Sequence, residues 1–289
     1  MGEEQPVTTP TLPSTVGVYG GGRMGAGIAH AFLVSGSRVV VVEGDDALAE
    51  AARGRVVTSV GKAAERGLLP ATVEEVLTAL SVTTTPDDLT GCGLVVEAVP
   101  EDTELKLAVL RRAEQVAPDA VLATNTSSLS VSALAAGLKA PERFIGLHFF
   151  NPVPASDLVE VVVGEQTAPA LVEQARGWVD ALGKTGITVQ DSPGFASSRL
   201  GVAIALEAMR MVQEGVASAA DIDTAMTLGY RHPVGPLRTT DIVGLDVRLA
   251  IAEHLTRELG PRFEPPQVLR DKVAAGELGR KTGRGFYDW

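Results

Sequence analysis

The chain of 289 residues contains a single cysteine, Cys92, which excludes an internal disulfide. This thiol lies in the apolar run 92–96, and we interpret it as a structural thiol of a protein in the reducing cytoplasm. No segment approaches the ~18 uninterrupted apolar residues that a membrane helix needs, so we expect no membrane partner. Residues 1–15 lack the basic start and the apolar stretch of a signal peptide, and we predict a disordered tail there.

The chain also has no excess of basic charge: it contains 25 Lys and Arg and 36 Asp and Glu, which gives a net charge of −11. A surface that binds nucleic acid must neutralise phosphates, so this balance argues against a nucleic-acid partner. The apolar fraction of 45% and the charged fraction of 21% are typical of a folded protein and exclude a disordered chain. The length predicts about two domains at roughly 100–200 residues each.

Short apolar runs alternate with helical segments up to Asp191, which predicts an α/β domain, a Rossmann-type doubly wound sheet, over residues 16–191. We expect strands at 16–19, 38–42, 82–85, 94–99, 121–124, 144–148, 158–163 and 187–190, and helices at 26–34, 45–65, 70–80, 102–116, 129–136 and 169–182.

No strand-like run follows Asp191, and we expect an all-α C-terminal domain over residues 192–289. Ser192 and Pro193 match a helix N-cap followed by proline at the first helical position. Residues 218–221 match a capping box that opens another helix. Further helices are expected near 245–259 and 266–275.

Residues 20–25 follow the first predicted strand and match the dinucleotide fingerprint G-x-G-x-x-G, with glycines at 20, 22 and 25. Gly20 permits a tight turn, Gly22 lets the backbone approach a pyrophosphate, and Gly25 allows close helix–strand contact. Arg23 and Met24 complete the candidate contacts. Glu43 ends the second strand, where a carboxylate accepts hydrogen bonds from ribose hydroxyls and repels a 2′-phosphate, which favours NAD over NADP. The alternative is a glycine turn that only connects two elements.

His148 differs from the other three histidines because it ends a predicted strand, and ligands of a doubly wound sheet collect at such ends. Glu160 lies on the next strand, after a turn long enough to bring the two residues side by side. A carboxylate bound to one imidazole nitrogen fixes the tautomer and leaves the other nitrogen to take a proton. The alternative is a packed histidine beside a chance acid. We interpret His30 and His254 as surface or packing residues, and His232 as structural.

Residues 124–128 (TNTSS) also follow a strand. Their short polar side chains can bind a nicotinamide ribose or a substrate oxygen, or they can cap the helix that starts near Leu129. Their positions alone do not decide between these uses.

Several segments occur together in one order: 20–29 (GGGRMGAGIA), 95–98 (VVEA), 124–129 (TNTSSL), 146–154 (GLHFFNPVP), 191–195 (DSPGF) and 281–287 (KTGRGFY). With them the chain resembles the short-chain L-3-hydroxyacyl-coenzyme A dehydrogenases, including bacterial 3-hydroxybutyryl-CoA dehydrogenases, from about Val16 to the C-terminus. The resemblance implies reversible, NAD-dependent oxidation of an (S)-3-hydroxyacyl-CoA to a 3-ketoacyl-CoA. It implies no metal.

The resemblance also implies roles for individual residues. His148 is the base that removes the 3-hydroxyl proton, Glu160 orients it, and Ser127 contacts both the substrate oxygen and the nicotinamide. Further positions that line the NAD site in relatives are Glu101, Lys106, Asn125, Asn151 and Lys281. The helical domain is expected to close over the acyl chain and to pair two subunits into a homodimer.

One position departs from the family pattern. Relatives carry an asparagine that helps bind the reacting oxygen, and this chain has Ser198 there. Losing one oxyanion donor can cost on the order of 10²–10³ in rate. Ser198 either reaches the oxygen through a water or indicates an altered substrate or weaker catalysis.

The predicted helix 45–65 and the residue after it carry Arg55, Ser59, Lys62 and Arg66 at spacings that place them on one face. Relatives use this helix for coenzyme A, whose phosphates such a basic stripe could hold. A solvated charged face is the alternative.

Two rival functions are compatible with the sequence. One is a dehydrogenase of the same fold that acts on a free hydroxy acid, a dicarboxylic hydroxyacyl-CoA or an acyl group on a carrier protein. The other is an NAD-binding structural or sensor protein with decayed catalysis, against which His148, Glu160 and Ser127 speak.

Overall fold

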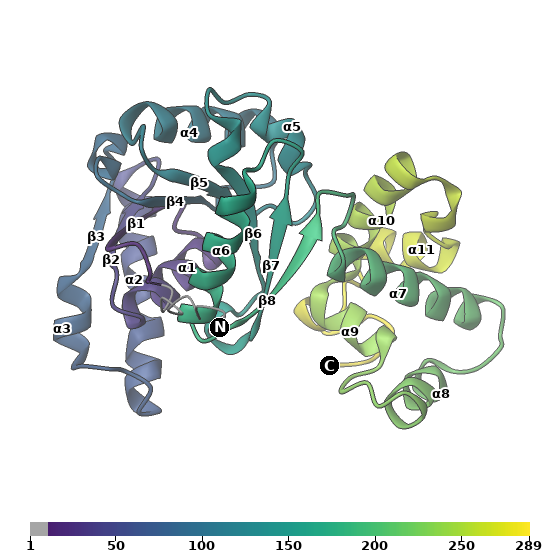
Figure 1. The fold of residues 1–289 in the computed structure, drawn as a ribbon. Helices are drawn as coiled ribbons and strands as arrows, with labels where there is room; N and C mark the ends of the chain where they lie inside the picture. Colours follow the sequence, from purple (N-terminus) through teal and green to yellow (C-terminus); the bar gives the residue numbers. More distant parts are fainter. Residues whose placement is uncertain (1–10) are drawn as a thin grey trace, which may run out of the picture. The chain divides into compact units, whose positions relative to one another are not determined.

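The computed structural model describes residues 11–289, which divide into two compact units. Unit 1 ends at Asp191 and unit 2 begins at Ser192 (Figure 1). Of the disordered tail expected at 1–15, residues 1–10 lie outside the described residues. The prediction is wrong for the part that follows, because Leu12 packs against the core, the Pro13 carbonyl accepts from Ser37 Oγ at 2.8 Å and Thr15 begins β1. Within residues 11–289, no helix is long and apolar enough to cross a membrane.

Unit 1 is built on an eight-stranded sheet with the order β3-β2-β1-β4-β5-β6-β7-β8, which confirms the predicted doubly wound α/β fold. Strands β1 to β6 run parallel to one another. The order reverses between β1 and β4, the switch point at which such sheets bind ligands. The strands are β1 (Thr15–Tyr19), β2 (Arg38–Val42), β3 (Leu80–Thr83), β4 (Leu94–Glu97), β5 (Val121–Thr124), β6 (Phe144–Phe149), β7 (Leu158–Val163) and β8 (Thr185–Gln190).

The last part of the sheet is not purely parallel, because β7 runs antiparallel to β6. Residues 150–157 join the two strands and hold only the short 3₁₀ turn η3 (Val153–Ala155). A parallel crossover needs a dozen or more residues, so a connection of this length returns the chain alongside β6 in the opposite direction. Strand β8 is parallel to β7.

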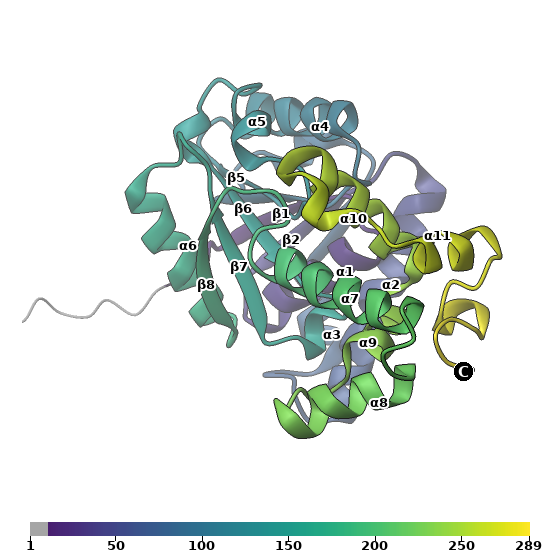
Figure 2. The same cartoon turned by 90° about the vertical axis from the view of Figure 1, so that its right-hand side faces the viewer.

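Helices cover both faces of the sheet, as a parallel core requires. On one face lie α1 (Arg23–Val34), α2 (Asp46–Glu65) and α6 (Pro169–Ala181), whose buried apolar residues share one core with the strands. On the other lie α4 (Thr103–Val116) and α5 (Val131–Ala135), side by side (Figures 1 and 2). The short α3 (Val73–Thr78) begins at a capping box of Thr72 and Glu75.

Cys92 lies just before β4 and is buried. Burial raises the pKa of its thiol to about 11, because the charged thiolate is poorly solvated there.

Unit 2 is helical, and its described residues form no strand beyond isolated bridges. Its helices are α7 (Ser197–Gln213), α8 (Ala219–Thr224), α9 (Pro236–Val243), α10 (Leu245–Leu259) and α11 (Gln267–Ala274), packed around an apolar core of their own. The predicted cap at Ser218 is confirmed, since its side chain accepts from the Asp221 N–H.

The predicted helix start at Ser192 is wrong. The N–H of Phe195 donates to the carbonyl of Ser192 at 2.8 Å, and both Gly194 and Phe195 have positive φ, at 75° and 48°. These residues therefore form a tight turn, and α7 begins only at Ser197. The Ser-Pro pair is followed by a glycine that favours the left-handed conformation, which ends any helix there.

Two buried carboxylates hold the end of unit 2 together. Asp241 of α9 accepts from the backbone N–H groups of Phe286 and Tyr287 and from the Trp289 indole, each at 2.9 Å. Asp223 of α8 accepts from the N–H of Leu237 at 2.8 Å and from the neighbouring backbone N–H at 2.9 Å. Each carboxylate thus has several donors around it.

The glycine turn generates a stability prediction. A Cβ at Gly25 would lie 1.8 Å from the carbonyl oxygen of Gly20, whereas a Cβ at Gly22 would meet nothing within 4 Å. We expect Gly25→Ala to lower the free energy of unfolding by about 1–3 kcal/mol, because α1 must move away from the turn. Gly22→Ala should stay within ~0.5 kcal/mol of wild type. Urea denaturation measures both, and equal stability of the two variants would contradict the close approach.

Candidate active site

The turn at residues 20–25 joins β1 to α1 and leaves the helix N-terminus open. Gly20 adopts φ 94°, and its N–H donates to the Val42 carbonyl at 2.8 Å. Gly22 is the N-cap of α1, and no side chain bonds to the first N–H groups of the helix. Open N–H groups at a helix start, together with the free space beside Gly22, suit the pyrophosphate of a dinucleotide.

Glu43 follows β2 and lies beside this turn. Its Oε1 accepts from the Gly21 N–H at 2.6 Å, which brings the acid and the glycines together although they are 22 residues apart. Arg55 of α2 donates from Nη1 to the Gly21 carbonyl at 3.1 Å, a contact that the sequence analysis did not foresee. The N–H of Gly21 is therefore bound by an acidic side chain and its carbonyl by a basic one.

His148 and Glu160 face each other across the antiparallel pair β6 and β7, in direct register. The imidazole Nδ1 lies 2.7 Å from Glu160 Oε2, and the side chains are 8% and 0% exposed. The ring of Phe150 packs against the imidazole with centroids 4.5 Å apart. Because Nδ1 is engaged by the carboxylate, a proton taken from a substrate would go to Nε2.

Asn125 ties the ends of three neighbouring strands together. Its N–H donates to the Glu97 carbonyl at the end of β4, at 2.9 Å. Its Oδ1 accepts from the N–H of Phe149, the residue after His148, at 2.8 Å. The strand end that carries the histidine is thus fixed to the end of β5.

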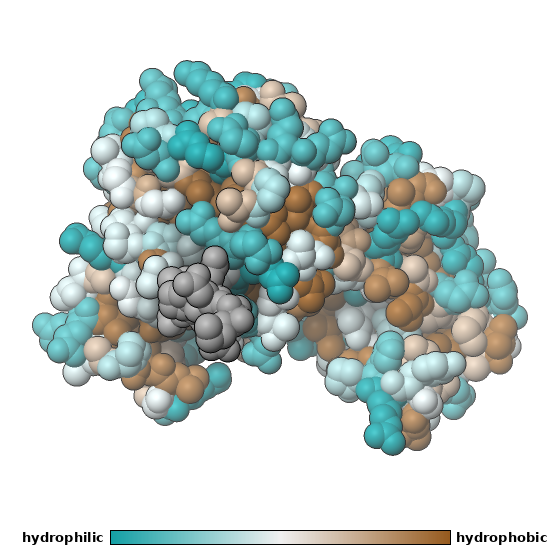
Figure 3. All heavy atoms as spheres, viewed as in Figure 1, coloured by the Kyte–Doolittle hydropathy of each residue, from teal (hydrophilic) through white to brown (hydrophobic). Residues whose placement is uncertain are grey.

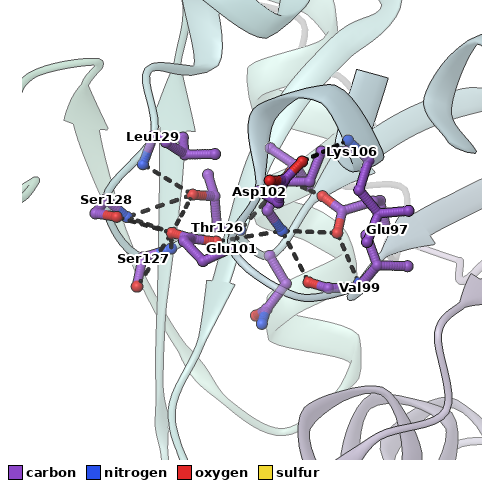
Figure 4. Close-up of polar contacts among 12 residues, drawn as sticks. Glu97, Val99, Glu101, Asp102, Lys106, Thr126, Ser127, Ser128 and Leu129 are labelled. Atoms are coloured by element: carbon purple, nitrogen blue, oxygen red, sulfur yellow. Dashed lines mark hydrogen bonds and ion pairs between the residues drawn. The ribbon is translucent and has the colours of Figure 1, made fainter. Parts of the chain in front are cut away.

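A buried network that the sequence analysis missed lies beside these strand ends (Figure 4). Lys106 of α4 is 1% exposed, and its Nζ lies 2.7 Å from Glu97 Oε1 and 3.3 Å from Glu101 Oε2. It also donates to the Val99 carbonyl at 3.1 Å. Lys106 therefore reaches protein acceptors in three directions and joins two carboxylates. Glu97 stood in one of the segments that carry the resemblance, but it had no assigned role.

Glu101 in turn holds the loop after β5. Its Oε1 accepts from the Thr126 hydroxyl at 2.6 Å and from the Ser127 N–H at 2.9 Å. The N–H and hydroxyl of Ser128 also donate to it, at 3.0 and 2.9 Å. Ser127 Oγ lies 3.3 Å from the same oxygen. The Glu101 carboxylate therefore binds the loop 126–128, for which the sequence left both helix capping and ligand binding open.

The pKa values of the two acids in this network are shifted in opposite directions. Burial raises the pKa of Glu97, although the Lys106 charge opposes it. Burial also acts to raise the pKa of Glu101, but the Lys106 charge and the hydrogen bonds from the 126–128 loop outweigh it, so that pKa is lowered. Glu101 therefore remains an acceptor for the loop at neutral pH.

A cavity of about 810 Å³ opens in unit 1 beside α1 and α2. The predicted basic stripe lines it, and so do two of the candidate NAD contacts; these residues are Arg55, Ser59, Lys62, Arg66, Arg23 and Asn151. His30, which we interpreted as surface or packing, also lines it, with Nδ1 3.1 Å from Ser59 Oγ. Burial lowers the pKa of His30, and Lys184 adds to the effect.

Two predicted site residues belong to unit 2. Ser198 lies in the first turn of α7. Lys281 lies in the 3₁₀ turn η6 (Arg280–Thr282), where its Nζ is 2.6 Å from both carboxylate oxygens of Asp246. Over residues 11–289, no group of three or more His, Cys, Asp and Glu is placed to hold a metal ion.

The buried network generates a second prediction. We expect Lys106→Met to lower the free energy of unfolding at pH 7 by about 3–5 kcal/mol, because Glu97 is left buried and unpaired. Burial favours its neutral form, so its pKa in the folded variant rises above the unfolded value. The loss of unfolding free energy should therefore be largest above that raised pKa and decrease as the pH falls below it.

Denaturation curves at pH 7 and pH 5 measure this deficit. The double variant Lys106→Met, Glu97→Gln should recover much of the loss, and Lys139→Met, at an exposed lysine, should stay within ~0.5 kcal/mol of wild type. A pH-independent deficit would contradict the role of Glu97.

Comparisons with known proteins place both units in one family. Residues 15–192 match the family described as 3-hydroxyacyl-CoA dehydrogenase, NAD binding domain, and residues 194–289 match the 3-hydroxyacyl-CoA dehydrogenase C-terminal domain. The chain is 42% identical over 275 residues to the probable 3-hydroxybutyryl-CoA dehydrogenase of Deinococcus radiodurans, covering 94% of this chain and 99% of the relative.

More distant relatives and a solved structure agree. The mitochondrial hydroxyacyl-coenzyme A dehydrogenase of Sus scrofa is 38% identical, with 96% of this chain and 92% of the relative covered. The crystal structure of (S)-3-hydroxybutyryl-CoA dehydrogenase from Ralstonia eutropha is 40% identical, with a TM-score of 0.92 over 96% of this chain and 99% of that one. The chain belongs to the 3-hydroxyacyl-CoA dehydrogenase family and is an NAD-dependent oxidoreductase of that family.

Proposed function

We propose that the protein interconverts a short-chain (S)-3-hydroxyacyl-CoA, such as 3-hydroxybutyryl-CoA, and its 3-ketoacyl-CoA, with His148 as the general base. The observation that carries this proposal is the buried hydrogen bond of 2.7 Å between His148 and Glu160 at the carboxyl end of β6. The hydrogen bond from the Phe149 N–H to Asn125, two residues before Ser127, supports a site shared by this pair and the loop after β5.

Each residue has a defined task in this proposal. Glu160 holds the imidazole in one tautomer and stabilises the imidazolium that forms when Nε2 takes the 3-hydroxyl proton. Ser127 donates to the substrate oxygen, and Glu101 fixes the loop that presents it. Bound NAD supplies the acceptor for the hydride that leaves carbon 3. General base catalysis of this kind typically contributes about 10²–10⁴ in rate.

The glycine turn and Glu43 support NAD as the dinucleotide. The turn offers N–H groups to the pyrophosphate, and the acid beside it repels the 2′-phosphate of NADP. The candidate NAD contacts Glu101, Lys106 and Asn125 lie at the neighbouring strand ends, where Lys106 acts by holding Glu101. Asn151 and Lys281 keep their proposed role as further contacts.

The cavity beside α1 and α2 supports a coenzyme A site. It presents Arg55, Lys62 and Arg66 together, in a chain whose net charge is −11, so the lining is basic against an acidic background. Phosphates bind such a cluster of cations through charge-assisted hydrogen bonds.

We also propose that unit 2 pairs two copies into a homodimer in the cytoplasm. Large apolar side chains are exposed on α7, α9 and α10, and Figure 3 shows apolar residues on the surface of unit 2; those of the three helices are Leu200, Ile204, Ile242, Val243 and Val247. Exposed large apolar side chains on three helices of one unit support an association surface there.

The function is tested by following NADH oxidation with acetoacetyl-CoA. We expect turnover by the wild type with NADH well above that with NADPH. His148→Gln should lower kcat by about 10²–10⁴ while NADH binding persists, because the base is lost but the nucleotide turn is intact. His232→Gln, in a turn of unit 2, is the matched control and should keep full activity. Near-wild-type turnover by His148→Gln would overturn the assignment of the base, and binding of NADH without turnover of any 3-ketoacyl-CoA would overturn the enzyme function.

The coenzyme A site is tested by charge reversal. We expect Lys62→Glu and Arg66→Glu to raise KM for acetoacetyl-CoA about tenfold or more, with little change in KM for NADH. Arg55 is not used, because its contact with Gly21 ties it to the nucleotide turn. Lys139→Glu, at an exposed lysine of unit 1 outside the cavity lining, should leave both constants unchanged. An unchanged KM for acetoacetyl-CoA in Lys62→Glu and Arg66→Glu would mean that these side chains form a solvated charged face and do not bind coenzyme A.

A further inference from the structure

His30 is a buried histidine that uses only one of its ring nitrogens within unit 1. It lies on α1 and is 5% exposed, and its Nδ1 lies 3.1 Å from the Ser59 hydroxyl of α2. Over residues 11–289, the buried polar side-chain atoms without a hydrogen-bond partner are Arg248 Nε and His254 Nε2. Nε2 of His30 is therefore not enclosed by protein, and it opens onto the cavity beside α1 and α2 that the residue lines.

The imidazole offers this cavity one neutral hydrogen-bonding group. Burial and the nearby charge of Lys184 keep the pKa of His30 below its usual range, so the ring is uncharged near pH 7. The Lys184 ammonium itself donates to the carbonyls of Val153 and Ser156, at 2.8 and 2.6 Å. A neutral imidazole has one N–H and one lone pair, and Ser59 occupies one of its nitrogens. The other nitrogen suits a neutral polar group of a ligand better than a phosphate, which forms its strongest hydrogen bonds with cations.

The helices that carry His30 and Ser59 run side by side in the same direction. The glycine turn before α1 meets Arg55 of α2, and further along both helices His30 meets Ser59. Lys62 and Arg66 follow Ser59 by about one and two helical turns, and both line the cavity. These two cations therefore lie beyond His30, toward the C-terminal ends of α1 and α2.

On its other side, His30 is close to the loop that follows the candidate catalytic histidine. Gly27 is one turn nearer the start of α1, and a Cβ there would lie 2.8 Å from Val153 Cβ. Helix α1 thus packs directly on residues 151–155, which line the same cavity and follow strand β6 with His148. His30 therefore lies between the two cations at one end of the cavity and this loop at the other.

We propose that His30 binds an amide of the pantetheine arm of the acyl-CoA through Nε2 and makes the site specific for that arm. This inference rests on the proposed function, which assigns the CoA phosphates to Lys62 and Arg66 and the reacting carbon to His148. The pantetheine arm joins these two parts of an acyl-CoA, so it has to pass His30. Each of its amides offers both a C=O and an N–H, so Nε2 finds a complement in either tautomer. Apolar residues of the cavity lining suit the methylene groups of the arm, among them Ala26, Val34, Ala63 and Pro154.

The test compares three thioesters as substrates with NADH. They are acetoacetyl-CoA, acetoacetyl-pantetheine, which lacks the phosphates, and S-ethyl acetothioacetate, which lacks the amides as well. His30→Asn keeps a polar group at the position of Nδ1 but none at that of Nε2, which His30→Gln does reach. We expect His30→Asn to lower kcat/KM about tenfold for the two substrates with amides, mainly through KM, and to change it by less than ~3-fold for the third. His30→Gln should retain most of the wild-type value for all three.

Two control variants separate the arm from the phosphates. Lys62→Glu should raise KM for acetoacetyl-CoA with little effect on acetoacetyl-pantetheine, because only the first substrate carries the phosphates. His232→Asn, in a turn of unit 2 outside the cavity lining, should match the wild type with each substrate. If His30→Asn does not fold, His30→Leu, which also lacks a hydrogen-bonding group at the position of Nε2, gives the same comparison.

The other outcomes decide against the inference. An unchanged kcat/KM for acetoacetyl-CoA in His30→Asn overturns it and leaves the proposed function standing. An equal loss with all three substrates, including the thioester without amides, assigns His30 a structural role and also overturns it. A wild type that does not reduce acetoacetyl-CoA removes the proposed function, and the inference with it.

Discussion

The short connection between β6 and β7 is the constraint on which the candidate catalytic pair depends. Residues 150–157 are too few for a crossover helix, so β7 must return antiparallel to β6. The reversal sets Glu160 directly opposite His148 and buries both inside the sheet. A parallel arrangement would carry the acid to another strand position. The hydrogen bond between the two side chains is therefore a consequence of loop length as much as of residue type.

Lys106 also stabilises the site, because this one cation forms ion pairs with two acids. It neutralises Glu97 inside the fold and steadies Glu101, which collects the donors of the 126–128 loop. Because the ends of β4, β5 and β6 are also joined through Asn125, the network and the histidine share one rigid support. Rigid positioning of this kind is what a site for hydride and proton transfer requires, since small displacements of reacting groups are costly.

Much of the fold could be predicted from the sequence, because strand runs such as 38–42 and the glycines at 20, 22 and 25 carry strong local signals. The turn before 158–163 also indicated that Glu160 lies beside His148, but the direct register of the two residues depends on how the strands pair, which the sequence does not specify. The helix start at Ser192 was predicted wrongly, because a Ser-Pro pair has the same local chemistry in a cap and in a turn. The roles of Glu97 and His30 depend on contacts 9 and 29 residues away, which no local pattern encodes.

The buried position of Cys92 has a practical consequence for work on this protein. It is the sole sulfhydryl of the chain, and with a pKa of about 11 it is almost entirely in the unreactive neutral form near pH 7.5. A cysteine introduced on the surface, with an ordinary pKa near ~8.5, would carry on the order of 10² more thiolate at that pH. Fluorophores or spin labels could therefore be attached at a chosen point of either unit while the native sulfur is left in place.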